Sequence, residues 1–262
     1  MEAGQRRRHE EFPSALLGNR RTITVALPPG YDDKSSRRYP VLYLHDGQNL
    51  FDPAEAAFGM AWDAHTTATR LALARRIRPV ILVGIANTPA RMDEYTYHRD
   101  ARQDAGGLGS LYARFVLDEV KPFIDREYRT LPGREDTAVA GSSMGGLVSL
   151  SMAREHHERF AMCGALSPSL WWARGKVLAE YAEGGAWMRR MRFWIDMGTR
   201  EGSRRGHVTP MIQNTRRLIG HLDRAGLDPG RDYYYWEVAG GEHNENAWAA
   251  RFDKVLMYFF GE

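Results

Sequence analysis

One stretch in the middle of the chain constrains the fold more than any other: an apolar run that leads into Gly-x-Ser-x-Gly. Residues 137–140 are typical of a buried strand, and 141–145 (Gly-Ser-Ser-Met-Gly) form an abrupt turn before a helix rich in small residues. A serine on a strained strand-to-helix turn needs neighbours without bulk, because adjacent segments pack closely there. With 26 glycines in 262 residues, the five letters alone arise by accident in roughly one such chain in ten. The interpretation of Ser143 as a nucleophile therefore depends on the strand before the motif and the helix after it.

The rest of the chain alternates between apolar runs, typical of strands buried in a parallel sheet, and amphipathic segments. Strands are expected at 21–27, 39–44, 79–86, 137–140, 160–166, 192–198 and 233–238, and helices at 61–77, 111–128, after Ser143, and at 176–183, 210–225 and 246–260. The first strand alternates polar and apolar residues, which predicts a half-exposed strand near a sheet edge. Residues 91–109 are polar, aromatic and glycine-rich, as in a long functional loop. This order predicts an α/β fold: one doubly wound, mostly parallel sheet with helices on both faces, spanning residues 21–262. Residues 1–20 are expected to be a frayed or loosely packed N-terminal extension.

Composition narrows the class of protein. Apolar residues make up 43% of the chain, enough for a sizeable core, and the formal net charge is +3. The tight basic run Arg6–Arg8 is interpreted as a solvated terminus rather than a nucleic-acid arm. Cys163 is the single cysteine, so no internal disulfide forms. No apolar stretch approaches the roughly 20 residues of a membrane span, and the N-terminus lacks the apolar core of a signal peptide. We therefore expect a cytoplasmic protein, or a secreted one if a leader was removed, with neither nucleic acid nor membrane as partner; the sequence leaves the oligomeric state open.

A serine nucleophile needs a histidine base, and the base needs a carboxylate that holds its tautomer. Among the nine histidines, His243 lies after the last expected strand and before the final helix, where the chain order Ser, acid, His places the base. The acid should follow the preceding strand, and two residues compete for it. Glu201 lies in the loop beyond Gly198 and is preferred. Asp196, inside the strand, is the second choice, and a serine–histidine dyad without a fixed acid is the third alternative.

The negative charge that develops on the substrate oxygen needs two backbone N–H donors. The residue after the nucleophile, Met144, supplies one candidate amide. The turn after the strand at 39–44 supplies the other, and there Gln48 follows a glycine that allows close approach of the backbone. The alternative is that Asp46-Gly47 is only a tight turn.

Five blocks taken together resemble the Putative esterase family of α/β-hydrolases. They are residues 43–52 (Tyr-Leu-His-Asp-Gly-Gln-Asn-Leu-Phe-Asp), 141–146 (Gly-Ser-Ser-Met-Gly-Gly), 167–169 (Ser-Pro-Ser), 198–201 (Gly-Thr-Arg-Glu) and 242–243 (Glu-His). The family contains esterase D (S-formylglutathione hydrolase), siderophore esterases of the enterobactin type, feruloyl and acetylxylan esterases, and mycolyltransferases. The resemblance, from about residue 22 to the C-terminus, implies an α/β-hydrolase fold and ester hydrolysis through an acyl-enzyme. It places the triad on Ser143, Glu201 and His243 and the oxyanion amides on Gln48 and Met144, although the family's acid is often Asp.

The expected function is that of a serine carboxylic-ester hydrolase acting on small soluble esters without cofactor or metal. Acyl transfer and thioester cleavage use the same triad and remain alternatives, and a binding protein without turnover is disfavoured because no triad member is missing. Trp171, Trp172 and Tyr95 are candidates for an aromatic substrate wall, with a place in the core as the alternative. The sequence does not say which ester is cleaved.

Overall fold

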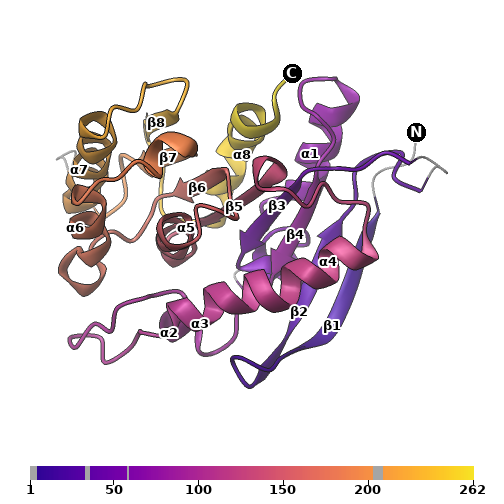
Figure 1. Cartoon of the computed structure of the whole chain (residues 1–262), viewed down its shortest axis with the longest axis horizontal. Coiled ribbons are helices and arrows are strands. Elements are labelled where there is room, and N and C mark those ends of the chain that lie inside the picture. Colours follow the sequence, from indigo (N-terminus) through magenta and orange to yellow (C-terminus); the bar gives the residue numbers. More distant parts are fainter. Residues whose placement is uncertain (1–4, 33–35, 58, 203–208) are drawn as a thin grey trace.

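The computed structural model describes residues 5–32, 36–57, 59–202 and 209–262, and in this part of the chain one eight-stranded sheet forms the centre (Figure 1). Its strands run in the order β1-β2-β4-β3-β5-β6-β7-β8. β1 pairs antiparallel with β2, β2 pairs antiparallel with β4, and all later neighbours are parallel. The strands are β1 (Arg6–Ser14), β2 (Asn19–Ala26), β3 (Val41–His45), β4 (Ile81–Ile85), β5 (Thr137–Ser142), β6 (Met162–Leu166), β7 (Arg192–Gly198) and β8 (Tyr233–Val238).

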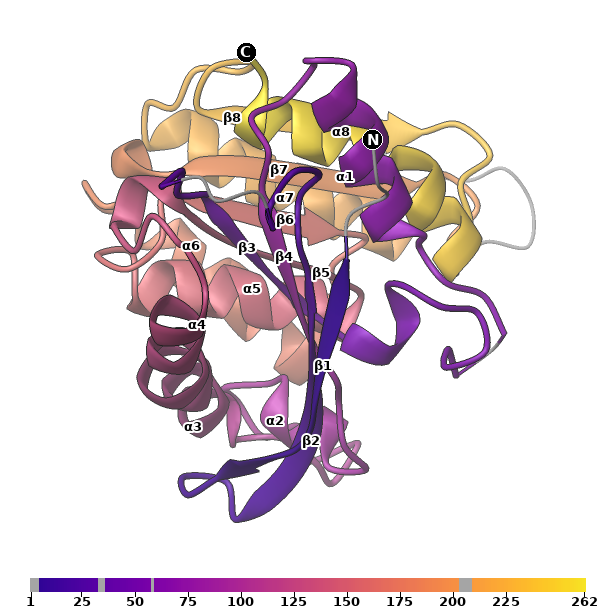
Figure 2. The same cartoon turned by 90° about the vertical axis from the view of Figure 1, so that its right-hand side faces the viewer.

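Helices cover both faces of the sheet, which confirms the predicted α/β architecture (Figure 2). α1 (Ala64–Leu73) and α8 (Glu245–Phe260) pack on one face. The other face carries α3 (Gly109–Arg114), α4 (Lys121–Glu127), α5 (Met144–Glu155), α6 (Lys176–Ala182) and α7 (Pro210–Arg224). Short helical turns complete the structure: α2 (Arg91–Glu94), a π-helical turn (Phe115–Val120), and 3₁₀ turns at Gly47–Asn49, Arg134–Asp136, Trp172–Arg174 and Met188–Arg190.

The strand order reverses between β3 and β5. From β3 the chain crosses to β4 on one side and then returns to place β5 on the other side. In open parallel sheets, the crevice at the carboxyl ends of the strands beside such a reversal is the usual ligand site. The loop after β3 and the turn after β5, which carry Gln48 and Ser143, both begin there.

The N-terminal segment differs from its prediction. Residues 1–4 lie outside the described part, but Arg6–Ser14 form an edge strand rather than a frayed extension. Phe12 anchors the strand, because its ring packs on Phe115 and Phe123 at centroid distances of 6.2 and 5.1 Å. The basic run is also paired within the chain, since Arg7 Nη2 lies 2.8 Å from Asp32 Oδ1 and Arg8 contacts Glu55. With β1 outside it, β2 is no longer at the edge, and its second half is buried instead of half-exposed.

The helix expected at 111–128 is one continuous rod of three parts. α3 runs directly into the π-helical turn Phe115–Val120, and α4 follows with Pro122 in its first turn. Proline has no N–H to donate inside a continuous helix, and Pro122 follows directly after the π-helical turn, where the regular i→i−4 hydrogen-bond pattern is already interrupted. Among the described residues, no helix is long and apolar enough to cross a membrane.

Candidate active site

Ser143 is held on a strained turn between β5 and α5. Its backbone has φ 57° and ψ −120°, a region that costs a non-glycine residue about 1–3 kcal/mol. The turn is tight enough that a Cβ on Gly141 would lie 2.8 Å from the carbonyl carbon of Gly145. The Ser143 amide donates to the carbonyl oxygen of Leu166 at 2.9 Å, which ties the turn to the end of β6. The sequence therefore places a partly exposed hydroxyl at the carboxyl edge of the sheet.

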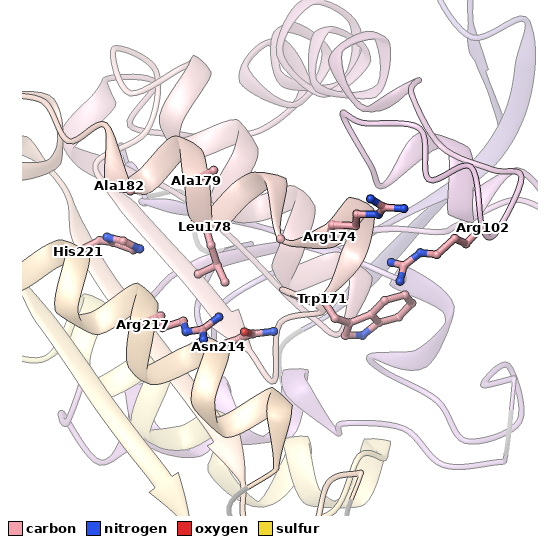
Figure 3. A pocket seen from close by; sticks show the side chains of 10 residues that line it. Arg102, Trp171, Arg174, Leu178, Ala179, Ala182, Asn214, Arg217 and His221 are labelled. Carbon is pink, nitrogen blue, oxygen red and sulfur yellow. The ribbon is translucent and has the colours of Figure 1, made fainter.

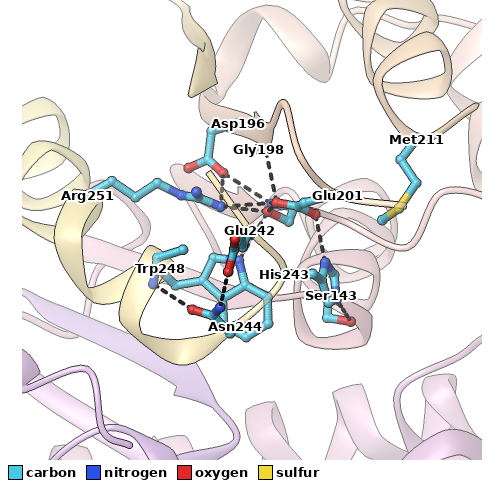
Figure 4. Close-up of polar contacts among 12 residues, drawn as sticks. Ser143, Asp196, Gly198, Glu201, Met211, Glu242, His243, Asn244, Trp248 and Arg251 are labelled. Atoms are coloured by element: carbon cyan, nitrogen blue, oxygen red, sulfur yellow. Dashed lines mark hydrogen bonds and ion pairs between the residues drawn. The ribbon is translucent and has the colours of Figure 1, made fainter. Parts of the chain in front are cut away.

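The structure brings Ser143, His243 and Glu201 into one hydrogen-bonded series (Figure 4). His243 Nε2 lies 2.9 Å from Ser143 Oγ, and His243 Nδ1 lies 2.7 Å from Glu201 Oε2. The loops that carry the base and the acid are joined by their backbones, since the amide of Arg200 donates to the carbonyl oxygen of Gly241 at 2.9 Å. The Trp248 ring meets the imidazole edge-on at 4.9 Å between centroids. Three segments far apart in sequence thus converge with the spacing of a nucleophile, a base and an acid.

Glu201 is buried, and its carboxylate is surrounded by donors. Its Oε1 accepts hydrogen bonds from Ser167 Oγ at 2.5 Å and from the Gly198 amide at 2.9 Å. Burial by itself would raise the pKa of Glu201, but the hydrogen bonds from His243, Ser167 and the Gly198 amide outweigh it, so the pKa lies below its ordinary value. Glu201 is therefore ionised beside His243 at neutral pH. The turn admits only glycine at 198, because a Cβ there would lie 2.6 Å from the backbone carbonyl carbon of Gly241 and equally close to Glu201 Oε1.

Asp196, the second choice for the acid, lies behind Glu201 rather than beside the base. Its Oδ1 is 2.9 Å from Nη2 of Arg251, and its Oδ2 accepts from Trp194 Nε1 at 2.7 Å. Arg251 Nη2 also lies 3.7 Å from Glu201 Oε1, so one guanidinium faces both carboxylates. Burial raises the pKa of Asp196 to about 6, although Arg251 and the Trp194 hydrogen bond oppose the shift. Within the described part of the chain, Glu201 is the carboxylate that pairs with His243.

The two candidate oxyanion amides lie on neighbouring segments. Met144 is the first residue of α5, where the N–H groups have no partner in the helix, and Gln48 lies in the turn after β3. The segments touch, since a Cβ on Gly145 would lie 3.2 Å from His45 Cβ. Gln48 is anchored by its side chain, whose Oε1 accepts the Asn87 amide at 3.1 Å. Gln48 and Met144 stay the candidate oxyanion donors.

A second arginine holds the loop after β3. Arg91 forms a fork on Asp46, with Nε–Oδ1 at 2.7 Å and Nη2–Oδ2 at 2.8 Å, and Asn87 Nδ2 donates to the same carboxylate at 2.6 Å. Asp46 itself has left-handed backbone angles, φ 57° and ψ 46°. The turn is therefore more than a simple reversal, because side chains from the β4 end fix it.

The predicted aromatic wall is mostly core. Tyr95 is fully buried, and its hydroxyl accepts the Asp46 amide at 3.0 Å, so it supports the loop after β3 and does not face a ligand. Trp172 is also buried and donates from Nε1 to the carbonyl oxygen of His98 at 2.7 Å. Both assignments as substrate-binding residues are wrong, because each ring lies in the interior. Trp171 is 38% exposed and stays a candidate.

Sequence reasoning assigned no role to Arg251, Ser167 and Arg91, which position the predicted residues; Ser167 was noted only as part of the block 167–169. Ser167 Oγ accepts from Arg251 Nη2 at 2.6 Å and from Trp248 Nε1 at 3.1 Å while donating to Glu201. The position of Arg251 in the sequence could have drawn attention to it. It lies three residues after Trp248 and one before Phe252, so it places a charge on the apolar face of the last helix. Arg91 could not have been found in this way, because it lies in a stretch without hydrophobic periodicity.

Comparison with known proteins places the chain among esterases. A family model described as "Putative esterase" matches residues 14–259. The uncharacterized protein YbbA of Bacillus subtilis is 24% identical over 254 residues, which cover 94% of each chain. Iron(III) salmochelin esterase of Escherichia coli O6:H1 is 27% identical over 86% of this chain, which spans 53% of that protein. A solved structure of a ferulic acid esterase superposes with a TM-score of 0.77 at 19% identity and covers 99% of both chains.

Proposed function

The chain belongs to the Putative esterase family, and from this premise we propose that it is a serine carboxylic-ester hydrolase that acts through an acyl-enzyme on small soluble esters. One observation carries the proposal: the series from Ser143 Oγ through His243 Nε2 and Nδ1 to Glu201 Oε2, with separations of 2.9 and 2.7 Å. These separations lie within the range over which a base takes a proton from a nucleophile.

In the acylation step, His243 Nε2 accepts the Ser143 proton as Oγ attacks the ester carbonyl carbon. The carbonyl oxygen becomes an oxyanion, and the backbone N–H groups of Gln48 and Met144 donate to it. Glu201 accepts the Nδ1–H of His243 and stabilises the imidazolium. The intermediate collapses, the C–O bond to the alcohol breaks, and His243 returns its proton to the departing oxygen.

Deacylation repeats these steps with water. His243 takes a proton from water, the hydroxide oxygen attacks the acyl carbon, and collapse releases the acid while Ser143 regains its proton. An alcohol in place of water would give acyl transfer, and a thioester would lose a thiol in place of an alcohol. Product analysis with a competing alcohol, and an ester panel with varied acyl and alcohol parts, separate these reactions.

Hydrolysis of p-nitrophenyl acetate tests the proposal. Wild type should show a burst of p-nitrophenol, and Ser143→Ala should lose kcat by about 10⁶-fold. Ser110→Ala, an exposed serine at the start of α3, is the matched control and should keep wild-type turnover. Undiminished turnover by Ser143→Ala would end the proposal.

A further inference from the structure

A groove opens between α6 and α7, close to the candidate active site but separate from it (Figure 3). Its volume is about 560 Å³, within the range of small-molecule sites. Trp171 and Arg102 close one end, and Asn214, Arg217 and His221 line the side formed by α7. Neither Ser143 nor His243 is among the lining residues, so the groove is a neighbour of the nucleophile rather than its own pocket.

The lining carries positive charge without a carboxylate. Arg174 and Arg217 are exposed and make no ion pair with any acidic residue that the structure describes. Arg102 is paired, with Nη2 3.1 Å from Asp100 Oδ2. On α6, Glu180 faces His98 at 2.5 Å, so its charge is engaged away from the two arginines. At least two guanidinium groups in the groove are therefore available to an anion.

Two chain segments connect the groove to the nucleophile. Ser169 Oγ lies 3.3 Å from Ser143 Oγ, and Trp171 follows two residues later, a reach of at most about 7 Å between Cα atoms. On the other side, a Cβ on Gly202 would lie 3.3 Å from Met211 Sδ, and Met211 precedes Asn214 by one helical turn. Figure 4 shows Met211 on the side of Glu201 and His243. The groove thus begins at Trp171, two residues beyond a side chain that contacts the nucleophile, and a substrate long enough to pass from Ser143 over Trp171 would enter it.

We propose that this groove binds an anionic group on the part of the ester remote from the scissile bond, with Arg174 and Arg217 as its binding residues. The proposal rests on the proposed ester hydrolysis and names its substrate class: esters that bear a carboxylate-type charge beside a flat, apolar portion. The guanidinium forks match the two oxygens of such a group, and the exposed indole of Trp171 offers a surface for the flat portion. Because both arginines are exposed, the attraction weakens as salt is added.

Matched substrate pairs test the charge alone. Monophenyl succinate carries a carboxylate on the acyl side of the ester, and 4-acetoxybenzoate carries one on the alcohol side. In each neutral partner, called the amide, a carboxamide replaces this carboxylate and the ester bond is kept. At low salt, at least one acid should exceed its amide in kcat/KM by about tenfold or more. The double variant Arg174→Met/Arg217→Met should bring that ratio close to one, because it removes the advantage of the charged ester over its amide. Arg70→Met, an exposed arginine on α1, is the control and should leave the ratio unchanged.

Titration calorimetry with benzoate and benzamide adds a readout that does not require turnover. Wild type should bind benzoate more tightly, and the double variant should lose the difference. The inference would be overturned if wild type showed the same kcat/KM and the same affinity for the acid and the amide. It would also be overturned if the double variant kept the higher values for the acid. If wild type cleaves no ester, or Ser143→Ala cleaves as fast, the proposed hydrolysis fails instead, and calorimetry still decides whether the groove binds anions.

Discussion

Two arginine–carboxylate pairs flank the nucleophile, and they differ in how they are built. On one side, Arg91 grips Asp46 with a two-pronged fork, and its side chain is 27% exposed. On the other, Arg251 is 1% exposed and uses one nitrogen, Nη2, to reach Asp196, Glu201 and Ser167. Its Nε and Nη1 have no hydrogen-bond partner among the described residues.

The difference follows from what each arginine supports. Arg91 fixes a turn of the main chain, for which a rigid fork on one carboxylate is sufficient. Arg251 balances two buried carboxylates, one of which pairs with a base whose charge changes during the proposed reaction. A change of charge at Glu201, Asp196 or Arg251 should therefore reduce activity or stability more than the same change at Asp46 or Arg91, because water does not screen buried charges.

The largest expected effect is on catalysis by Glu201→Gln. The amide keeps the shape but loses the charge that stabilises the imidazolium, so kcat for p-nitrophenyl acetate should fall by about 10⁴-fold. Asp46→Asn makes the same chemical change on the other side and should cost at most the 10²–10³-fold typical of a lost oxyanion donor. A Glu201→Gln enzyme within tenfold of wild type would contradict the assignment of the acid.

The next effect concerns stability. Arg251→Met leaves two buried carboxylates without their cation and should lower the free energy of unfolding by about 3–5 kcal/mol, whereas Arg91→Met should cost about 1–2 kcal/mol. Urea unfolding at pH 7 measures both. The double variant Arg251→Met/Asp196→Asn should recover part of the loss, since it removes one of the uncompensated charges. A larger cost for Arg91→Met would reverse the comparison.

The last expected effect, smaller than the loss for Arg251→Met, is a dependence of stability on pH. The pKa of Asp196 is about 6 in the folded protein against an ordinary 3.8, so the folded state holds this proton more tightly. The resulting stability is fully present below about pH 4 and is lost as pH rises through 6, about 3 kcal/mol in all. Asp196→Asn lacks this dependence, so its stability relative to wild type should improve between pH 4 and 7. Urea unfolding across that range measures the difference, and a constant difference would show that Asp196 does not titrate in this way.

Local patterns determined much of the candidate site because its parts follow short rules. The strand, the small-residue turn and the helix around Ser143 are contiguous, and chain order alone directs attention to His243. The choice between Glu201 and Asp196 is different in kind. The two residues are five apart on one strand and its loop, and only the packing of α8 decides that Arg251 lies between them and that Glu201 faces the imidazole.

Segments that depend on distant partners were harder to predict. The strand β1 is polar and mostly exposed, and it is ordered because it pairs with β2 and because Phe12 packs on the α3–α4 rod. Tyr95 lies in the irregular stretch 91–109 and Trp172 lies just beyond a strand end, so no local pattern shows whether these rings line a ligand site or belong to the core.

The sequence by itself determined the α/β class, the identity of the nucleophile candidate and the order of its helpers, because periodicity, turn chemistry and chain order are local or one-dimensional properties. Only the tertiary structure decided which carboxylate meets His243, which aromatic rings face solvent, and that Arg174 and Arg217, which form no ion pair among the described residues, line one groove with Trp171. Those outcomes depend on distances between segments that the chain brings together only when it folds.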